Sequence, residues 1–458
     1  MARHRVRVEI QVDTEWVDIT RDVYTREDIS ITRGRADEGQ DVDPGKCSFV
    51  LNNRDGRYSP RNPRSPYYGL LGRNTPIRLS VVLDGRVYPR FCGEVSAWPP
   101  KWDLSGKDVY VTVEASGILR RLNGSVNALE SALRRFIVAE GPRAYWPLTD
   151  GVNTQNAAAE RGGNITYTFN RTGDLDAPMA WASGDIASWL EPVATTPDKA
   201  PSGEFRGYVR GNNRPDSWAV DFVRMGRGGS DAFRVEVGGA GTDADPMVWW
   251  ELGFNPTTRQ LSVLIRTTGA TSSSLGSVVQ PWAQARAFDD DVAHVFRFQV
   301  VRVTASSVRW TVYMDGVQLR TGTWSAIPRG VVRWYYDWFH PDGGDAGPVS
   351  LGHITVWDAA IAPDPLILQL AYHGHAGETA GARIERVCTE AGIPVAFVGD
   401  PDDTQLVGPQ ELGTPLDVLN SAARVDGGIL YEDRESARLV YRTNRSRYNR
   451  GYLLPEDN

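Results

Sequence analysis

Short apolar runs that end at glycine, proline, asparagine or aspartate constrain this chain more than any other feature. Val6, Val8 and Ile10 alternate with charged residues, which is the period of a half-buried strand. Comparable runs occupy residues 48–51, 77–83, 109–114, 218–223, 233–237, 248–254, 260–265, 295–303 and 308–314. The 46 glycines and 28 prolines supply turns between such runs. The sequence therefore predicts a mainly β fold.

Tryptophan and cysteine divide the 458 residues into three regions. Twelve of the 15 tryptophans lie between residues 141 and 365, and all three cysteines lie outside that interval. We expect an N-terminal antiparallel barrel or sandwich over residues 1–140 and a two-sheet β-sandwich over residues 141–365. Residues 366–458 are expected to form an α+β scaffold domain.

The α+β prediction for residues 366–458 rests on the spacing of apolar residues, which changes there from the period of a strand to that of a helix. Residues 384–388 have helical spacing. A second helix is expected to begin at Pro415, with Thr414 as its N-cap. Residues 428–432 and 439–442 then indicate a β-hairpin.

Charge and motifs exclude several functions. Proteins that coat nucleic acid carry an excess of positive charge, whereas this chain has a net charge of −7. Nucleic acid is therefore not expected as a partner. No run approaches the ~20 apolar residues of a membrane span, and residues 1–10 lack the apolar core of a signal peptide. Cys47, Cys92 and Cys388 are too far apart for a disulfide framework and are expected to be buried thiols.

Signatures of enzymes are also missing from the sequence. There is no G-x-S-x-G, Walker A or H-E-x-x-H motif. We therefore predict that the chain is not an enzyme and assign no catalytic residue. A pair of carboxylates brought together by the fold, as in glycoside hydrolysis, stays open because spacing in sequence does not show it.

Segments in two parts of the chain resemble a known family. Residues 31–35, 47–63 and 67–78, and later 425–433 and 441–443, are similar to minor tail proteins of actinobacterial phages and prophages. The resemblance implies a tail-hub component located at the virion tail tip and assembled in the cytoplasm of the host bacterium. It also implies a homotrimer that contacts other phage tail proteins.

The middle region resembles a laminin-G or concanavalin-like jelly roll. The similar stretches are residues 144–151, 294–298, 313–316 and 351–358. This resemblance implies a jelly-roll fold inserted into the tail-hub scaffold, with its first and last strands paired. It does not choose among sugar binders, protein binders and spacers.

An aromatic run at residues 334–340 is the candidate carbohydrate-binding segment. It has five aromatic rings in six residues, too many for one face of a strand. Exposed rings beside polar groups stack on sugars, which nominates Tyr336, Asp337, Trp338 and His340. The alternative is that Trp334, Tyr336 and Trp338 fill the core.

Calcium is the only cofactor that the sequence suggests. Asp342 and Asp345 lie in a glycine-rich loop whose oxygens suit that ion, although ordinary turn chemistry explains them too. Further candidates are Asp243, Asp245 and the acidic run at residues 289–291. A zinc site at His373 and His375 lacks further ligands nearby in sequence.

Six arginines within 25 residues form a candidate subunit-docking segment: Arg54, Arg57, Arg61, Arg64, Arg73 and Arg78. Guanidinium groups pair well with carboxylates of a neighbouring subunit. The alternatives are a solvated loop, pairing within the same chain and contact with DNA in the tail lumen.

Together these features predict a structural component of a phage tail tip whose jelly roll contacts host cell-surface carbohydrate. The predicted partners are other tail proteins, further copies of the chain and host cell-wall glycan. A cell-wall-degrading tail enzyme and a purely architectural tail-tip protein are the alternatives.

Overall fold

The computed structural model forms two compact units. It describes residues 5–35, 37, 40–123, 128–170, 179–197, 202–226, 230–239, 247–255, 258–268, 273–275, 279–283, 288, 290–339 and 347–448. Unit 1 comprises Met1–Leu129, Gly377–Gly408 and Gly413–Asn458, and unit 2 comprises Glu130–Ala376 and Pro409–Leu412. The predicted mainly β fold is confirmed.

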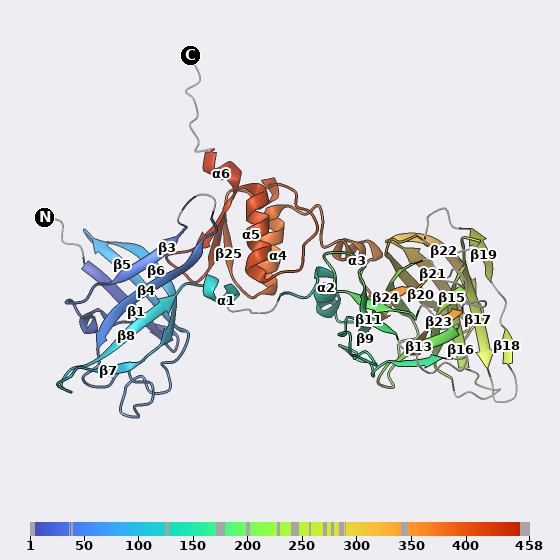
Figure 1. Ribbon diagram of the computed structural model, residues 1–458, viewed down its shortest axis with the longest axis horizontal. Helices are drawn as coiled ribbons and strands as arrows, with labels where there is room; N and C mark the ends of the chain where they lie inside the picture. Colours follow the sequence, from blue (N-terminus) through green and yellow to red (C-terminus); the bar gives the residue numbers. More distant parts are fainter. Residues whose placement is uncertain are drawn as a thin grey trace, which may run out of the picture. The chain divides into compact units, whose positions relative to one another are not determined.

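The N-terminal part of unit 1 is an antiparallel sheet that curls towards a barrel (Figure 1). Its strands are β1 (Arg5–Val12), β2 (Glu15–Asp18), β3 (Ser30–Gly34), β4 (Asp43–Asn52), β5 (Thr75–Leu83), β6 (Arg86–Ala97), β7 (Pro100–Trp102) and β8 (Val109–Ser116). The order is β2-β1-β5-β6-β8-β4-β3, and β7 pairs with β8.

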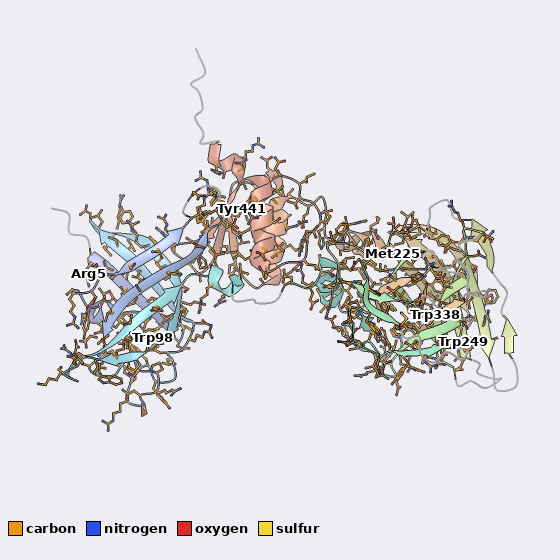
Figure 2. The ribbon with its side chains drawn as sticks, viewed as in Figure 1. Arg5, Trp98, Met225, Trp249, Trp338 and Tyr441 are labelled. Atoms are coloured by element: carbon orange, nitrogen blue, oxygen red, sulfur yellow. The ribbon has the colours of Figure 1, made fainter. Side chains whose placement is uncertain are left out.

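The segment after β2 carries this sheet towards closure. It contains a short 3-10 helix, η1 (Thr20–Asp22), and links the two ends of the sheet. On one side the Ile19 N–H donates to the Val8 carbonyl, and on the other the Tyr24 N–H donates to the Val50 carbonyl, both at 2.9 Å. The curled sheet encloses a core that includes Trp98 (Figure 2).

The second part of unit 1 is α+β, as predicted. Its elements are α1 (Leu119–Asn123), α4 (Ala380–Glu390), β25 (Val395–Val398), η2 (Pro401–Asp403), α5 (Pro415–Asp426), β26 (Ile429–Glu432), β27 (Leu439–Arg442) and α6 (Asn444–Tyr448). The sheet order is β25-β27-β26, with β25 parallel to β27. Helix α5 begins at Pro415 inside a capping box, in which Thr414 and Asp417 each accept the other's N–H.

Unit 2 is a β-sandwich of two sheets that enclose one aromatic core (Figure 2). The first sheet has the order β10-β13-β23-β15-β16-β17-β18, with β19 on β17. Its strands are β10 (Tyr167–Asn170), β13 (Ser202–Tyr208), β15 (Ser230–Val237), β16 (Met247–Asn255), β17 (Gln260–Thr268), β18 (Ser273–Leu275), β19 (Val279–Ala283) and β23 (Val331–Phe339).

The second sheet of the sandwich has the order β11-β12-β24-β14-β20-β21-β22, with β9 on β24. Its strands are β9 (Ala144–Trp146), β11 (Ala180–Gly184), β12 (Val193–Thr195), β14 (Trp218–Met225), β20 (His294–Thr304), β21 (Ser307–Met314), β22 (Val317–Trp324) and β24 (Ser350–Asp358). The expected pairing of the first and last strands is present, because Tyr145 lies opposite Thr355.

Two helices cover the outer face of this second sheet (Figure 1). They are α2 (Ala132–Glu140) and α3 (Pro365–Tyr372). Leu133 and Ile137 of α2 and Leu368 of α3 are buried there against apolar residues of β14, β20 and β24. Unit 2 therefore extends beyond residues 141–365 at both ends, because the amphipathic helices bury their apolar sides on the sandwich.

We call this second sheet the covered sheet and the first one the open sheet, because no described helix packs on the outer face of the first. No helix in the described part of the chain is long and apolar enough to cross a membrane.

Candidate functional site

The outward side chains of the open sheet form three rows across β13, β23, β15, β16 and β17. The rows follow from the register, because paired residues on neighbouring strands share a face. The first row is Glu204, Asp337, Ala232, Gly253 and Ser262, the second is Arg206, Tyr335, Arg234, Glu251 and Leu264, and the third is Tyr208, Arg333, Glu236, Trp249 and Arg266.

Three small residues in the first row leave a hollow in the sheet surface. Ala232, Gly253 and Ser262 are neighbours on three adjacent strands, and the hollow above them has a volume of about 440 Å³. A Cβ on Gly253 would lie 2.6 Å from the Ser262 hydroxyl oxygen, so a larger residue there would need that side chain to move. The hollow therefore exists because the side chains on its floor are short.

Charged groups stand on the wall of this hollow. Arg234 Nε donates to Glu251 Oε2 at 2.7 Å, and the same guanidinium pairs with Asp337. Burial opposes the charge of Arg234, but Asp337 and Glu251 outweigh it and raise the pKa of the guanidinium. The wall thus presents fixed carboxylate acceptors and guanidinium donors, which match the paired hydroxyls of a sugar.

On the same face, hydrogen bonds to Glu236 hold the side chains of Tyr335 and Trp249 in place. Its Oε2 accepts hydrogen bonds from Arg333 Nε (2.7 Å), the Tyr335 hydroxyl (2.8 Å) and Trp249 Nε1 (2.7 Å). Burial and the Glu236 charge raise the pKa of Tyr335, so its hydroxyl stays protonated and donates. Trp249 is half-buried in this position (Figure 2), and an ordered indole beside polar groups suits stacking on a sugar ring.

Tyr336 and Trp338 of the aromatic run were predicted to be exposed and to bind carbohydrate, but the structure places both in the core. These two side chains are 0% and 1% exposed because residues 334, 336 and 338 of β23 alternate towards the core. The Tyr336 hydroxyl bonds Asp231 and Arg224 there. Neither ring is therefore available to a sugar, and this part of the prediction is corrected.

Asp337 and His340 are the other two residues predicted to bind carbohydrate, and only Asp337 is among the described residues. Asp337 points outward on β23 and belongs to the wall of the hollow, whereas His340 lies outside the described residues. Sequence reasoning missed Arg234, Glu251 and Trp249. Their alternation with buried residues marked them as outward-facing, but no local signal placed Arg234 and Glu251 beside Asp337, or Trp249 on the same sheet face.

The calcium prediction falls mostly outside the described residues, which do not include Asp342, Asp345, Asp243, Asp245 or Asp289. Asp290 lies 3.0 Å from His294 Nε2, and His373 Nε2 lies 3.0 Å from the Gln369 amide. Within the described ranges, no three histidine, cysteine or acidic residues are grouped as a metal site. Calcium binding at Asp342 and Asp345 stays a prediction.

Three of the six candidate docking arginines pair with acids of their own chain. Arg54 and Arg57 bond Asp108 and Asp55, respectively, and Arg78 makes a two-pronged contact with Glu9. The other three, Arg61, Arg64 and Arg73, are exposed, and no carboxylate in the described part of the chain forms an ion pair with them. Docking through these residues stays a prediction.

The three cysteines are buried free thiols, as expected. Burial raises the pKa of Cys47 and of Cys388 to about 12. For Cys92, burial and nearby acids raise the pKa to about 11. These thiols are therefore protonated at neutral pH, which is typical of packing residues rather than nucleophiles.

Comparison with known proteins finds no matching family model and no matching curated protein. Among solved structures, a tetrameric galectin from Cinachyrella sp. (ball sponge) matches with a TM-score of 0.24 and 12% identity, over 34% of this chain and 99% of the galectin. The CBM2 module of the evolved Dit of Lactobacillus casei BL23 phage J-1 matches with a TM-score of 0.28 and 9% identity, over 46% and 94%.

The binding domain of botulinum neurotoxin serotype D also matches, with a TM-score of 0.33 and 5% identity, over 52% of this chain and 54% of that domain. All three scores lie below 0.5, and similarity at this level identifies neither a family nor a ligand.

Proposed function

We propose that this chain is a structural component of a phage tail tip and that the open sheet of unit 2 binds host cell-surface carbohydrate. The observation that carries the proposal is the hollow above Ala232, Gly253 and Ser262, walled by Arg234 and its two carboxylates. A concave site with a few fixed polar groups, on the same sheet face as the ordered ring of Trp249, suits a sugar. The proposed role is binding and not catalysis.

The tail-tip part of the proposal rests on the sequence stretches that resemble actinobacterial minor tail proteins. Those stretches fall in unit 1, which would then supply the contacts with other tail proteins and with further copies in a homotrimer. Unit 2 would supply the contact with the host. This division assigns assembly and adhesion to separate compact units.

The sugar site is tested by filling the hollow. Ser262→Trp places an indole over the small residues of the floor, and we expect at least a tenfold loss of affinity. Retention of the full chain on purified cell walls of host actinobacteria measures it. Thr323→Trp is the matched control, because Thr323 is an exposed small hydroxyl residue on β22 of the other sheet.

Each outcome of this experiment decides one point. Equal retention of the two variants would contradict the site, and no retention of the unsubstituted chain would favour the architectural alternative. Release of soluble sugars or peptides from the walls would favour the enzyme.

A further inference from the structure

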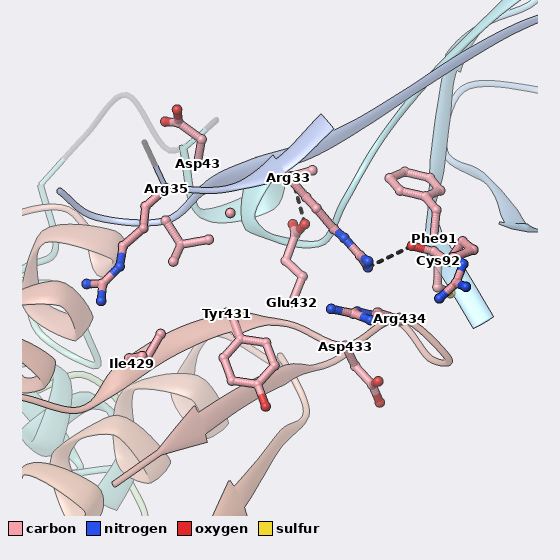
Figure 3. Close-up of a pocket in the computed structure, with 14 residues that line it drawn as sticks. Arg33, Arg35, Asp43, Phe91, Cys92, Ile429, Tyr431, Glu432, Asp433 and Arg434 are labelled. Carbon is pink, nitrogen blue, oxygen red and sulfur yellow. Dashed lines mark hydrogen bonds between the residues drawn. The ribbon is translucent and has the colours of Figure 1, made fainter. Parts of the chain in front are cut away.

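A second pocket lies in unit 1, beside β26 (Figure 3). Its volume is about 270 Å³, and residues of β3, β4, β6 and β26 and of the turn after β26 line it. Apolar contacts come from Phe91, Ile429 and Tyr431. Arg33 of β3, Arg90 of β6 and Arg434 after β26 also line the pocket. Figure 3 labels Arg33 and Arg434.

These three arginines are not neutralised within the described chain. Arg33 Nη1 donates to the Arg90 carbonyl at 2.8 Å, and none of the three guanidinium groups forms an ion pair with a described carboxylate. Burial and the charges of Arg434 and Arg90 lower the pKa of Arg33. Like charges brought together in this way indicate a place for an anionic group.

The two acids at the end of β26 are occupied by other partners. Glu432 accepts the Gly45 N–H on Oε2 (2.7 Å) and the Leu119 N–H on Oε1 (2.8 Å). Asp433 accepts from Arg438 Nε at 2.6 Å. Asp43 is the remaining acid that lines the pocket. The three arginines thus keep free donors for a carboxylate from outside.

The pocket continues into a second hollow, which suits an extended ligand. The second hollow has a volume of about 350 Å³ and shares Arg35, Val42 and Ile429 with the first. Strand β26, which contributes to both, is at the edge of its sheet, and an edge strand offers unpaired backbone groups to an added segment.

From this geometry we propose that the pocket beside β26 binds an extended acidic segment of a partner protein, with apolar side chains against the apolar lining residues and carboxylates on the three arginines. A peptide fits better than nucleic acid, because Phe91, Ile429 and Tyr431 can pack against apolar side chains of a peptide but offer no partner to a continuous phosphate backbone. The site lies in unit 1 and does not depend on sugar binding by unit 2.

Charge reversal tests this proposal on the full chain. The probe is a fluorescein-labelled eight-residue peptide of alternating glutamate and valine, and binding is followed by fluorescence anisotropy at low salt. We expect Arg33→Glu combined with Arg434→Glu to weaken binding at least tenfold. The milder pair Arg33→Gln and Arg434→Gln should weaken it about threefold, and thermal melting checks that both variants fold.

The matched control reverses the same amount of charge elsewhere. Arg86→Glu combined with Arg309→Glu changes two exposed arginines that do not line the pocket, and its affinity should stay within twofold of the unsubstituted chain. Equal loss in control and pocket variants would overturn the proposal, as would absence of peptide binding. Preferential binding of duplex DNA, lost on Arg33 and Arg434 reversal, would replace the peptide with a phosphate ligand.

Discussion

The two sheets of unit 2 use ion pairs on their outer faces in different ways. On the covered sheet, Arg297 Nε donates to Asp221 Oδ1 at 2.6 Å, and the two side chains are only 4% and 3% exposed. On the open sheet, Arg234 is 21% exposed and its partners Glu251 and Asp337 are 13% and 9% exposed. The pair on the covered sheet is therefore closed off from any ligand, whereas the pair on the open sheet borders the hollow.

Deleting unit 2 at two different boundaries should have the largest effect. Joining residue 129 to residue 377 through a Gly/Ser linker removes α2 and α3 together with the sandwich, and unit 1 should stay soluble. Joining residue 140 to residue 366 keeps α2 and all of α3 except Pro365, without the sheet that buries Leu133, Ile137 and Leu368. We expect aggregation of this second product on size-exclusion chromatography, since it exposes an apolar surface. Equal solubility of the two products would contradict a dependence of the helices on the covered sheet.

Removing one carboxylate from each face compares the two ion pairs directly. Asp221→Ala leaves Arg297 buried and also deprives Trp357 Nε1 of an acceptor at 2.7 Å, so unit 2 should lose about 3–5 kcal/mol of unfolding free energy. Asp337→Ala should cost about 1 kcal/mol, because Arg234 keeps Glu251 and some contact with solvent. Urea unfolding followed by tryptophan fluorescence measures both, and similar losses would break the comparison.

Acid should weaken the covered sheet through His353 of β24. Burial lowers the pKa of this imidazole to about 4, below the usual value of about 6.5. The unfolded chain therefore takes up the proton first, so stability is fully present above pH ~6.5 and falls by roughly 1–3 kcal/mol towards pH ~4.

His353→Asn is the variant that tests this pH dependence. Asparagine tolerates the positive φ of 51° at this position and does not titrate there. Melting temperatures between pH ~6.5 and ~4 should therefore fall less steeply in the variant than in the unsubstituted chain. Parallel slopes would show that other groups govern the acid response.

Calcium should have the smallest effect, and only if Asp342 and Asp345 bind it. These residues follow β23 of the open sheet in sequence. Millimolar calcium would then raise the melting temperature of unit 2 by a few degrees through mass action, and EDTA would reverse the gain. Identical melting curves in calcium and in EDTA would remove calcium from the description of this sheet.

Much of the fold could be predicted because strand patterns, turns and helix caps depend on residues that are close together in the sequence. Alternation identified β1, and a run of β-branched and aromatic residues identified β14. The Asp84-Gly85 turn has the positive φ angles, 47° and 79°, that a tight hairpin requires. Thr414 caps α5 as expected. Helix α3 and the parallel strand β25 were not predicted, since short elements of this kind are stabilised mainly by the surfaces on which they pack.

The sequence by itself determined that the aromatic run at residues 334–340 has too many rings for one face of a strand. Only the tertiary structure decided which side is the core, because Tyr335 and Tyr336 are chemically alike and alternation does not distinguish them. Tyr336 faces inward, where Arg224 and Asp231 satisfy its hydroxyl, and Tyr335 faces outward towards Glu236. The candidate sugar site depends on the same choice, since pairing of distant strands brings its residues together.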